Sequence, residues 1–501
     1  MSGLKNNQED TSQFQHIYTV TESSSTNLNF GAKLSNLQLF AILIGIFFGV
    51  FVSGIDETIL STAQEVITLD FNSPNYITWI ATAYLMPMVV FAPLYGKFCD
   101  IFGRKVCMLF ALTIFALGSL GIGAGGIVSV SYIIISDLVP LEKRGTYLGL
   151  TSISFAISNM LGPILGGIIV EHVTWRVIFY INLPVAGVLI FISLFIIPLP
   201  WVEGSVYNKL KRIDYFGVLT LSAAIVLFVL STTWGGDQYD WNSYQVILTL
   251  CLSFFFLGVF ILVELKFATE PVLPPKMFNV NVAICSLVNA ILGLIDFTII
   301  YYLPVYFQTL QGKSASQSGY ELAPFLVVSS IVAMLSGVFV NRVDSFRIPI
   351  WIGSAMMTVR SGLFCLISPN IPSWAMTVFS CILSFGIGCS LQITAIGAQA
   401  SAEPEYIAIV AGFFNFTLNF GGTVGLSIDG AILNSYLNAL TDSLDYEIYD
   451  TYNIFLLESD AYYSGLRAIF YFLLVTSLLA LISSVFLKHK SLKEVIIAPV
   501  H

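Results

Sequence analysis

Charged residues are scarce in this 501-residue chain: Asp, Glu, Lys and Arg make up 10% of it, whereas hydrophobic residues make up 56%. A soluble protein carries about a quarter charged residues, so the composition excludes an ordinary water-soluble protein and indicates one embedded in lipid. The net charge of −9 argues against a nucleic acid as partner. The densest acidity lies in one segment, residues 442–460, so it does not describe the whole surface.

Other features are missing as well. The seven cysteines lie in or beside apolar runs without paired spacing, which argues against a disulfide framework or a zinc site. No phosphate-binding loop with two glycines ahead of Lys-Ser or Lys-Thr occurs, so nothing points to ATP use. The first ~35 residues are polar and lack the basic start and apolar core of a signal peptide. We expect a disordered N-terminal tail, no cofactor, no metal and no enzymatic activity.

What the chain does contain is a series of apolar runs, most near the ~20 residues that a helix needs to cross a ~30 Å hydrocarbon core. They predict an all-α polytopic protein whose surroundings are the lipid bilayer. The thirteen predicted segments are 38–61, 76–95, 106–136, 146–169, 177–200, 214–233, 244–266, 283–305, 320–340, 348–368, 373–395, 406–431 and 467–487.

Lys and Arg are distributed unevenly among the predicted loops. If both termini lie in the cytoplasm, seventeen basic residues fall on the cytoplasmic side, and only Arg176, Lys313 and Arg467 on the other. Cytoplasmic loops carry the excess of basic residues in membrane proteins, so we expect this orientation. It requires an even number of crossings.

The thirteen predicted segments are an odd number, and the third segment explains the discrepancy. Residues 106–136 form one run of 31 residues, which is too long for an ordinary span and too short for two spans of ~20 residues with a turn. One interpretation is two short half-helices that meet at the sequence GSLGIGAGG. The interpretation that we favour is a chain lacking about one helix of ~20 residues at this point. Both give fourteen nominal spans, with the third and fourth shortened.

The loop GKFCDIFGRK, residues 96–105, has a spacing that makes chemical sense at a membrane surface. Gly96 and Gly103 permit a tight turn and the approach of a neighbouring helix. Asp100 can accept a hydrogen bond from an Arg or a helix N-terminus, and Arg104 with Lys105 keeps the loop cytoplasmic. The loop resembles the one between the second and third helices of the major facilitator superfamily. This resemblance implies that it acts as a latch between conformations.

A second motif, GPILGG, follows Asn159 in the predicted fifth helix and resembles the antiporter motif of the same superfamily. Gly162, Gly166 and Gly167 admit close helix packing, and Pro163 bends the helix. Glycine-rich packing alone also explains the motif, so both interpretations stay open.

Six further stretches point to one branch of this superfamily. With them the chain resembles the fourteen-span drug:H+ antiporter family from about residue 37 to residue 487. Within that family, two stretches look most similar to fungal vacuolar basic amino-acid transporters, with fungal multidrug exporters close behind: PLYGKFCDIFGRK (93–105) and YIIISDLVPLEKRGTYLG (132–149). The stretches are SGIDETILSTA (53–63), WIATAYLM (79–86), YIIISDLVPLEKRGTYLG (132–149), VTWRVIFYINLPVAG (173–187), WGGDQYDWNS (234–243) and YYLPVYFQTLQGKSASQSG (301–319).

The resemblance implies two six-helix halves with a substrate site between them near the midplane, and two extra helices inserted between the halves. We expect a monomer. The expected regions are a cytoplasmic tail at 1–36, an N-terminal bundle at 37–200, the inserted helices at 201–270, a C-terminal bundle at 271–487 with a lumenal or extracellular loop at 432–466, and a cytoplasmic tail at 488–501.

The implied function is a proton-coupled antiporter of small cationic molecules. Transport of basic amino acids into the vacuole is favoured, and multidrug export at the plasma membrane is the alternative. One departure matters: the family places an Arg ahead of the glycine run of the fourth helix, whereas here GIGAGG (121–126) follows FALGSL directly. An inactive truncated product therefore stays open, as does a nutrient sensor that binds without transport.

Ionisable side chains at the centre of a membrane helix cost at least ~2.5–3.5 kcal/mol on insertion scales, so each needs a reason. Asp56 matches the acidic position of the family's first-helix motif and is expected to couple protons or bind the cation. Glu57 points ~100° away from it and is the weaker candidate. Asp296 is expected to face the same region from the second half. Arg360 is expected to pair with one of these acids or to contact substrate.

Neutral polar residues within the apolar segments are weaker candidates. Asn159, Gln392, Asn415 and Asn419 either line the cavity or form hydrogen bonds between helices. Asp429, near the end of a predicted helix, is expected to be solvated together with the loop 432–466.

Overall fold

The structure is a computed structural model that describes residues 36–72, 77–118, 120–138, 141–195, 213–236, 238–267, 271–343, 345–365, 371–403, 406–443 and 451–490. The predicted tails fall almost entirely outside these ranges. Within them, β-type pairing is limited to one isolated bridge between Gly235 and Tyr239. All longer regular elements are helices, as the sequence predicts.

The first half of the molecule contains seven helices, of which two short ones follow each other as a single crossing. They are α2 (Asn36–Asp70), α3 (Ile77–Phe102), α4 (Arg104–Ala116), α5 (Leu120–Leu138), α6 (Leu141–His172), α7 (Arg176–Tyr180) and α8 (Asn182–Phe195).

Two helices connect this half to the second half, which again has six crossings. The connecting pair is α10 (Tyr215–Trp234) and α11 (Tyr244–Lys266). The second half consists of a short turn η3 (Pro275–Met277), then α12 (Val280–Val305) with its π-helical extension η4 (Tyr306–Leu310), α13 (Ala315–Val343), α14 (Arg347–Phe364), α15 (Ser373–Ser401), α16 (Ile407–Ser443) and α17 (Thr451–Val485).

The prediction of a polytopic helical protein is confirmed. With α7 and α8 counted as one, the described chain forms fourteen successive helices, of which 11 are long and apolar enough to cross a membrane. The three that fall short are α4, α5 and α14. The helix α14 contains two arginines in 18 residues, which lowers its hydropathy.

The segment 106–136 folds as two helices joined by a turn, in which Gly118 has a φ of 92°. A Cβ atom on Gly123 would meet Phe115, and one on Gly126 would meet Ala111, so α4 and α5 pack closely and antiparallel. With 13 residues, α4 is about 20 Å long and does not reach across a ~30 Å core. The structure thus forms the two short helices of the first interpretation. The favoured alternative of a missing helix stays a prediction.

The prediction of a loop at residues 432–466 is wrong for most of these residues. The helix α16 continues to Ser443 and α17 begins at Thr451, so residues 432–443 and 451–466 are helical. Hydropathy reports where a helix leaves the hydrocarbon core and not where it ends. The apolar spans themselves reach Ala439 and begin again at Ser459, so only residues 440–443 and 451–458 are helical continuations beyond them.

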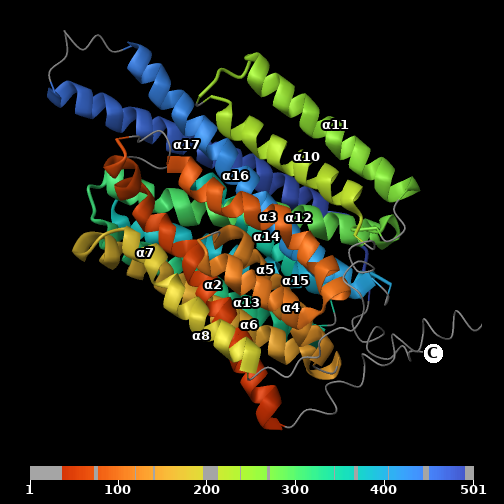
Figure 1. Ribbon diagram of the computed structural model, residues 1–501. Helices are drawn as coiled ribbons and strands as arrows, with labels where there is room; N and C mark the ends of the chain where they lie inside the picture. The colour runs from red at the N-terminus through yellow and green to blue at the C-terminus, as the bar shows by residue number, and fades with distance from the viewer. Residues whose placement is uncertain are drawn as a thin grey trace, which may run out of the picture.

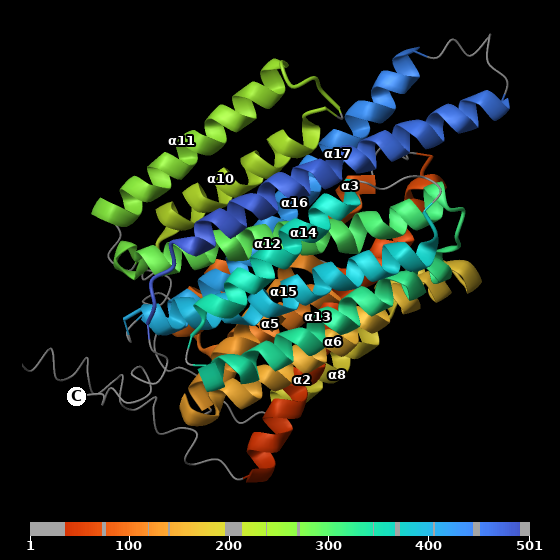
Figure 2. The ribbon, with the colours of Figure 1, turned by 180° about the vertical axis from the view of Figure 1, so that it is seen from behind.

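The two halves meet mainly through α2 with α12, α3 with α16, and α6 with α13, and also where α2 contacts α13 and α5 contacts α16. The inserted helix α10 packs against both α3 and α16, and α11 lies outside it, as both ribbon views show (Figures 1 and 2). The inserted pair thus borders the junction between the halves.

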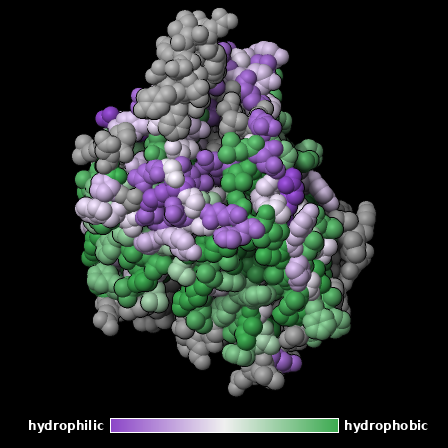
Figure 3. All heavy atoms as spheres, turned by 90° about the vertical axis from the view of Figure 1, so that its left-hand side faces the viewer, coloured by the Kyte–Doolittle hydropathy of each residue, from purple (hydrophilic) through white to green (hydrophobic). Residues whose placement is uncertain are grey.

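In Figure 3, polar residues gather in a band across one face and apolar residues cover the area below it.

Candidate functional site

Asp56 lies near the middle of a 31-residue apolar span, Phe40–Asp70. Its side chain is only 2% exposed. Asn182, the first residue of α8, donates from Nδ2 to Oδ1 of Asp56 at 2.6 Å. The Tyr84 hydroxyl lies beside Asp56 and interacts with it, but no hydrogen bond of good geometry reaches the other oxygen, Oδ2. A buried carboxylate with one unsatisfied oxygen is costly, so this group favours taking up a proton or a cation.

Glu57 and Asp296 bring the two halves of the molecule into electrostatic contact. Asp296 lies near the middle of the second 31-residue span, Val280–Leu310. It is partly exposed, and its charge acts directly on that of Glu57, as does the charge of Asp56. The structure therefore brings all three predicted acids together. Glu57, the weaker candidate, is the residue that connects the other two.

Tyrosines surround these acids. The Tyr301 hydroxyl donates to the backbone carbonyl of Glu57 at 2.7 Å, and Gln64 Nε2 donates to the backbone carbonyl of Tyr301 at 2.8 Å, which joins α2 to α12. Tyr132 on α5 lies close enough to sense the charge of Glu57. Tyrosine rings attract cations on their faces, so the group suits an organic cation. We call it the carboxylate cluster: Asp56, Glu57, Asp296, Tyr84, Tyr132 and Tyr301.

The glycine motif of α6 lies against this region. Cβ atoms on Gly162 and Gly166 would collide with Thr58 and with the carbonyl of Ile59, so α6 packs directly on α2. A Cβ on Gly167 would meet the backbone of α13, which belongs to the other half. The prediction of close helix packing is confirmed, and the Pro163 carbonyl also accepts a hydrogen bond from Thr62 Oγ1 at 3.0 Å.

The predicted lumenal ends of the halves are joined by a carboxylate. Glu171, near the end of α6, accepts a hydrogen bond at 2.8 Å from the backbone N–H of Ser316. Ser316 belongs to the first turn of α13, where backbone N–H groups lack partners within the helix. Glu171 thus caps a helix of the other half. At the same end, Asp70 of α2 accepts from Trp175 Nε1 at 2.9 Å and from Arg176 at 3.3 Å.

The predicted latch has a more local structure than its motif implies. Gly103 makes the turn with a φ of 95°, Arg104 donates to the Cys99 carbonyl at 3.1 Å, and the buried Lys105 donates to the Leu194 carbonyl at the end of α8, at 3.0 Å. The expectation for Gly96 is wrong, because it lies inside α3 with open space where a side chain would project. The side chain of Asp100 lies outside the described residues.

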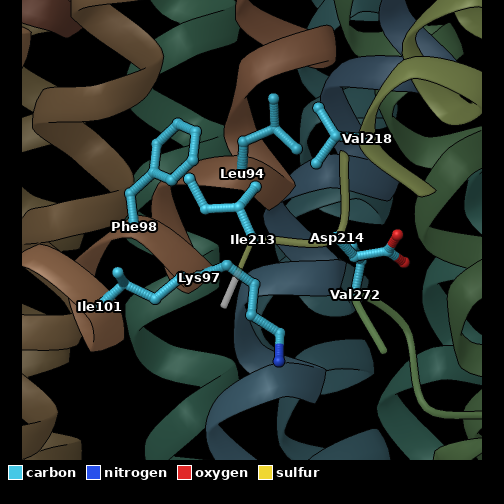
Figure 4. Close-up of a pocket in the computed structure, with 8 residues that line it drawn as sticks. All are labelled: Leu94, Lys97, Phe98, Ile101, Ile213, Asp214, Val218 and Val272. Atoms are coloured by element: carbon cyan, nitrogen blue, oxygen red, sulfur yellow. The ribbon is translucent and has the colours of Figure 1, made fainter. Parts of the chain in front are cut away.

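A small groove lies beside the latch (Figure 4). Its walls come from the end of α3, including Lys97 and Phe98, from Asp214 and Val218 at the start of α10, and from Val272. Leu94 on its edge is ten residues beyond Tyr84, which is about 15 Å along α3. The groove is therefore distinct from the carboxylate cluster and separates the latch from the inserted helices.

Arg360 does not pair with an acid, so this prediction is wrong. The guanidinium is fully buried, donates from Nε to the Phe379 carbonyl at 3.1 Å, and lies 3.0 Å from the ring centroid of Phe364. Within the described chain it forms no ion pair. Its helix, α14, packs against α15 and α17 and is separated from α2, which explains why the carboxylate cluster is out of reach.

The remaining polar candidates are scattered. Asp429 is fully buried and accepts from the Thr298 hydroxyl, so the prediction that it is solvated is wrong. Asn419 donates to the Asn415 carbonyl of its own helix at 2.9 Å. Asn159 is half-buried with an unpartnered Oδ1, and Gln392 is also half-buried.

Sequence reasoning missed four residues of the site: Asn182, Tyr84, Tyr132 and Tyr301. Each lies in a stretch that carries the family resemblance, such as VTWRVIFYINLPVAG for Asn182 and WIATAYLM for Tyr84. The signal was therefore present in the motifs. Its meaning depended on contacts between residues as far apart as 244 positions.

Comparison with known proteins agrees with this architecture. Residues 46–426 match the Major Facilitator Superfamily, and the chain belongs to this family. It is 32% identical to Citrate exporter 1 of Yarrowia lipolytica over 83% of this chain and 65% of that protein, which is just under two thirds of its length. It is 31% identical to Multidrug resistance protein 3 of Bacillus subtilis over 80% of this chain and 81% of that protein. It is 32% identical to the efflux pump dotC of Dothistroma septosporum over 82% of this chain and 74% of that protein.

Solved structures support the same fold. A bacterial homologue of the human lysosomal transporter Spinster, in an inward-facing and occupied conformation, aligns with a TM-score of 0.56 over 92% of this chain and 99% of that one, at 13% identity. An auto-inhibited peptide transporter of the POT family aligns with a TM-score of 0.54 over 89% of this chain and 98% of that one, also at 13% identity. The family match, the similar transporters and the apolar helices together make the protein a multi-pass secondary transporter of the major facilitator type.

Proposed function

We propose that this protein is a proton-coupled antiporter that moves small organic cations out of the cytoplasm. The observation that carries the proposal is the meeting of three carboxyl groups, two from α2 and one from α12, each near the middle of a 31-residue span. Among the described residues, Tyr84, Tyr132 and Tyr301 also interact electrostatically with acids of this cluster.

The cluster favours exchange for an electrostatic reason. Like charges repel strongly where the effective dielectric constant is low, so the three acids cannot all stay ionised without a positive partner. A proton or an organic cation relieves the same repulsion, which makes the two compete. Because Asp296 belongs to one half and Asp56 to the other, movement of the halves opens the site to one side of the membrane at a time.

Membrane and substrate are the finer parts of the proposal. The names of several relatives, which include efflux pumps and a multidrug resistance protein, support export of drug-like cations. The motif resemblance supports transport of basic amino acids into the vacuole. Both processes move a cation out of the cytoplasm against protons, and both fit the carboxylate cluster.

Purified protein in liposomes, with a proton gradient of defined direction, tests the proposal. We expect uptake of tetraphenylphosphonium, lysine or arginine that collapses when an uncoupler is added. Uptake that is unaffected by the uncoupler, or transport of citrate and of none of these cations, would overturn it. Saturable binding without any uptake would favour the nutrient sensor, and a fluorescent fusion in cells distinguishes the vacuolar from the plasma membrane.

A further inference from the structure

We infer that Asn182 is a positioning residue for proton exchange at Asp56, because its amide can satisfy that carboxyl group in both of its protonation states. The inference rests on the proposed function and assigns a role to a residue outside the acids themselves. Its starting observation is the 2.6 Å contact between two buried side chains, in which Asn182 is 5% exposed and Asp56 2%.

A side-chain amide is suited to this task. It carries a donor, Nδ2, and an acceptor, Oδ1, which exchange places when the group turns by 180°. Facing an ionised Asp56, Asn182 donates; facing the neutral acid, it accepts from the carboxyl O–H. A separation of 2.6 Å is within the usual range for O–H···O and just below it for N–H···O. Lys or Arg would stabilise only the ionised form, so they would hold the site in one state.

The backbone fixes Asn182 opposite Asp56. The residue opens α8 directly after the short helix α7, whose first residue is Arg176. Arg176 and Trp175 both bind Asp70, so one segment is attached to α2 at two places, Asp70 and Asp56. This arrangement gives the stretch VTWRVIFYINLPVAG a physical role, since its start anchors the segment and its centre contacts the acid.

Other titratable groups face the same acid. They are Glu57 on α2 itself, Tyr84 on α3 and Tyr301 on α12, with Asp296 and Tyr132 next to Glu57. Tyrosines ordinarily titrate near pH 10, outside the range from pH 5 to pH 8 that transport uses. The two other carboxyl groups stay in place in every variant compared below, so a difference between those variants reports on Asn182.

The test measures binding of tetraphenylphosphonium to purified protein as a function of pH. Asn182→Leu removes the bond to Asp56 in both protonation states, and the loss is larger for the ionised state because hydrogen bonds to charged groups are stronger, so proton release requires a higher pH. We expect the binding midpoint to rise by about one pH unit or more. Asn182→Gln should stay near the wild type. The matched control is Asn289→Leu, which removes a buried amide that donates to the Phe414 carbonyl at 2.8 Å and to Thr417; its midpoint should not move.

A midpoint of Asn182→Leu equal to that of Asn289→Leu would overturn the inference. If the Leu variant is not recovered from membranes, Asn182→Asp decides the question: two carboxyl groups that share a proton titrate in two steps, and a single unchanged step would overturn the inference. Failure of the proposed function looks different, because wild-type binding would then be independent of pH.

Discussion

The buried charges of the two parts of the molecule have different partners. In the carboxylate cluster, Glu57 is acted on by Asp56 of its own helix and by Asp296 of the other half. Deep in the second half, Asp429 is bound by the Thr298 hydroxyl, and Arg360 by a backbone carbonyl and an aromatic ring. All are buried or nearly so, but only the cluster combines charges from both halves.

This difference indicates that burial does not by itself identify a functional charge. The partners of Asp429 and Arg360 belong to the same half as the charge, so they move with it when the halves rock. The distance between Glu57 and Asp296 changes whenever α2 and α12 separate. A cation or proton bound in the cluster can therefore be coupled to the conformational change, and a charge enclosed within one half cannot.

Replacement of Asp56 should have the largest effect. Asp56→Asn keeps the size of the side chain and can keep a hydrogen bond to Asn182, but it cannot exchange a proton. We expect proton-driven uptake to fall to background while the amount of protein in the membrane stays unchanged. Asp429→Asn is the matched comparison, since it retains the bond to Thr298 and should reduce uptake far less. Equal losses in both variants would break the distinction between the cluster and the isolated charges.

Arg360 should affect stability more than transport. Arg360→Ala leaves a cavity beside Phe364 and removes a hydrogen bond, so we expect the free energy of unfolding to fall by about 2–5 kcal/mol. Arg360→Met fills most of the space without a charge, and such replacements of buried ions are often neutral. Thermal melting in detergent and uptake in liposomes measure the two effects separately. A stable Arg360→Met variant without transport would place Arg360 in the mechanism.

Gly118 provides a reference within the first half, away from the buried charges. Its φ of 92° lies in the region that favours glycine, so an Ala there should cost about 1–2 kcal/mol. We expect Gly118→Ala to lower the melting temperature and to leave the pH dependence of transport unchanged. Gly187, which has open space around it and no positive φ, is the control position. A shifted pH dependence in Gly118→Ala would connect the short α4–α5 hairpin to the cluster.

The sequence predicts the helices well because apolar runs follow directly from the cost of exposing polar groups to lipid. It also places Asp56 and Asp296 correctly, since an acid within such a run is conspicuous. It does not predict which residues the buried polar side chains contact. Whether Arg360 meets an acid depends on how α14 is rotated, and the contact of Asn182 with Asp56 joins residues 126 positions apart. The ends of α16 and α17 were missed because polar helices beyond the membrane have no apolar signal.

Of the substitutions considered, Glu171→Gln should have the smallest effect, and that effect concerns a single contact between the halves. Glu171 contacts the other half, like the cluster, but it lies at the predicted lumenal end and caps α13 at Ser316. A charged cap contributes about 0.3–1 kcal/mol, so its loss should shift the halves toward separation at that end by roughly two- to fivefold. Spin labels at the exposed positions Val173 and Tyr320, one on each half, would report a larger population of long distances. Glu403→Gln, an exposed carboxylate, is the control.

The effect of pH on this contact has a definite sign. The cap is strongest when Glu171 is ionised, and a Glu carboxyl ordinarily titrates near pH 4.3. The hydrogen bond from the Ser316 N–H favours the ionised carboxylate. The distance distribution of the wild type should therefore stay constant at neutral pH and move toward separation only as the pH falls below that value, whereas Glu171→Gln should show the separated population throughout. If acid changes the distances equally in both, the response belongs to other groups, and the carboxylate cluster, which also joins the halves, becomes the first place to examine.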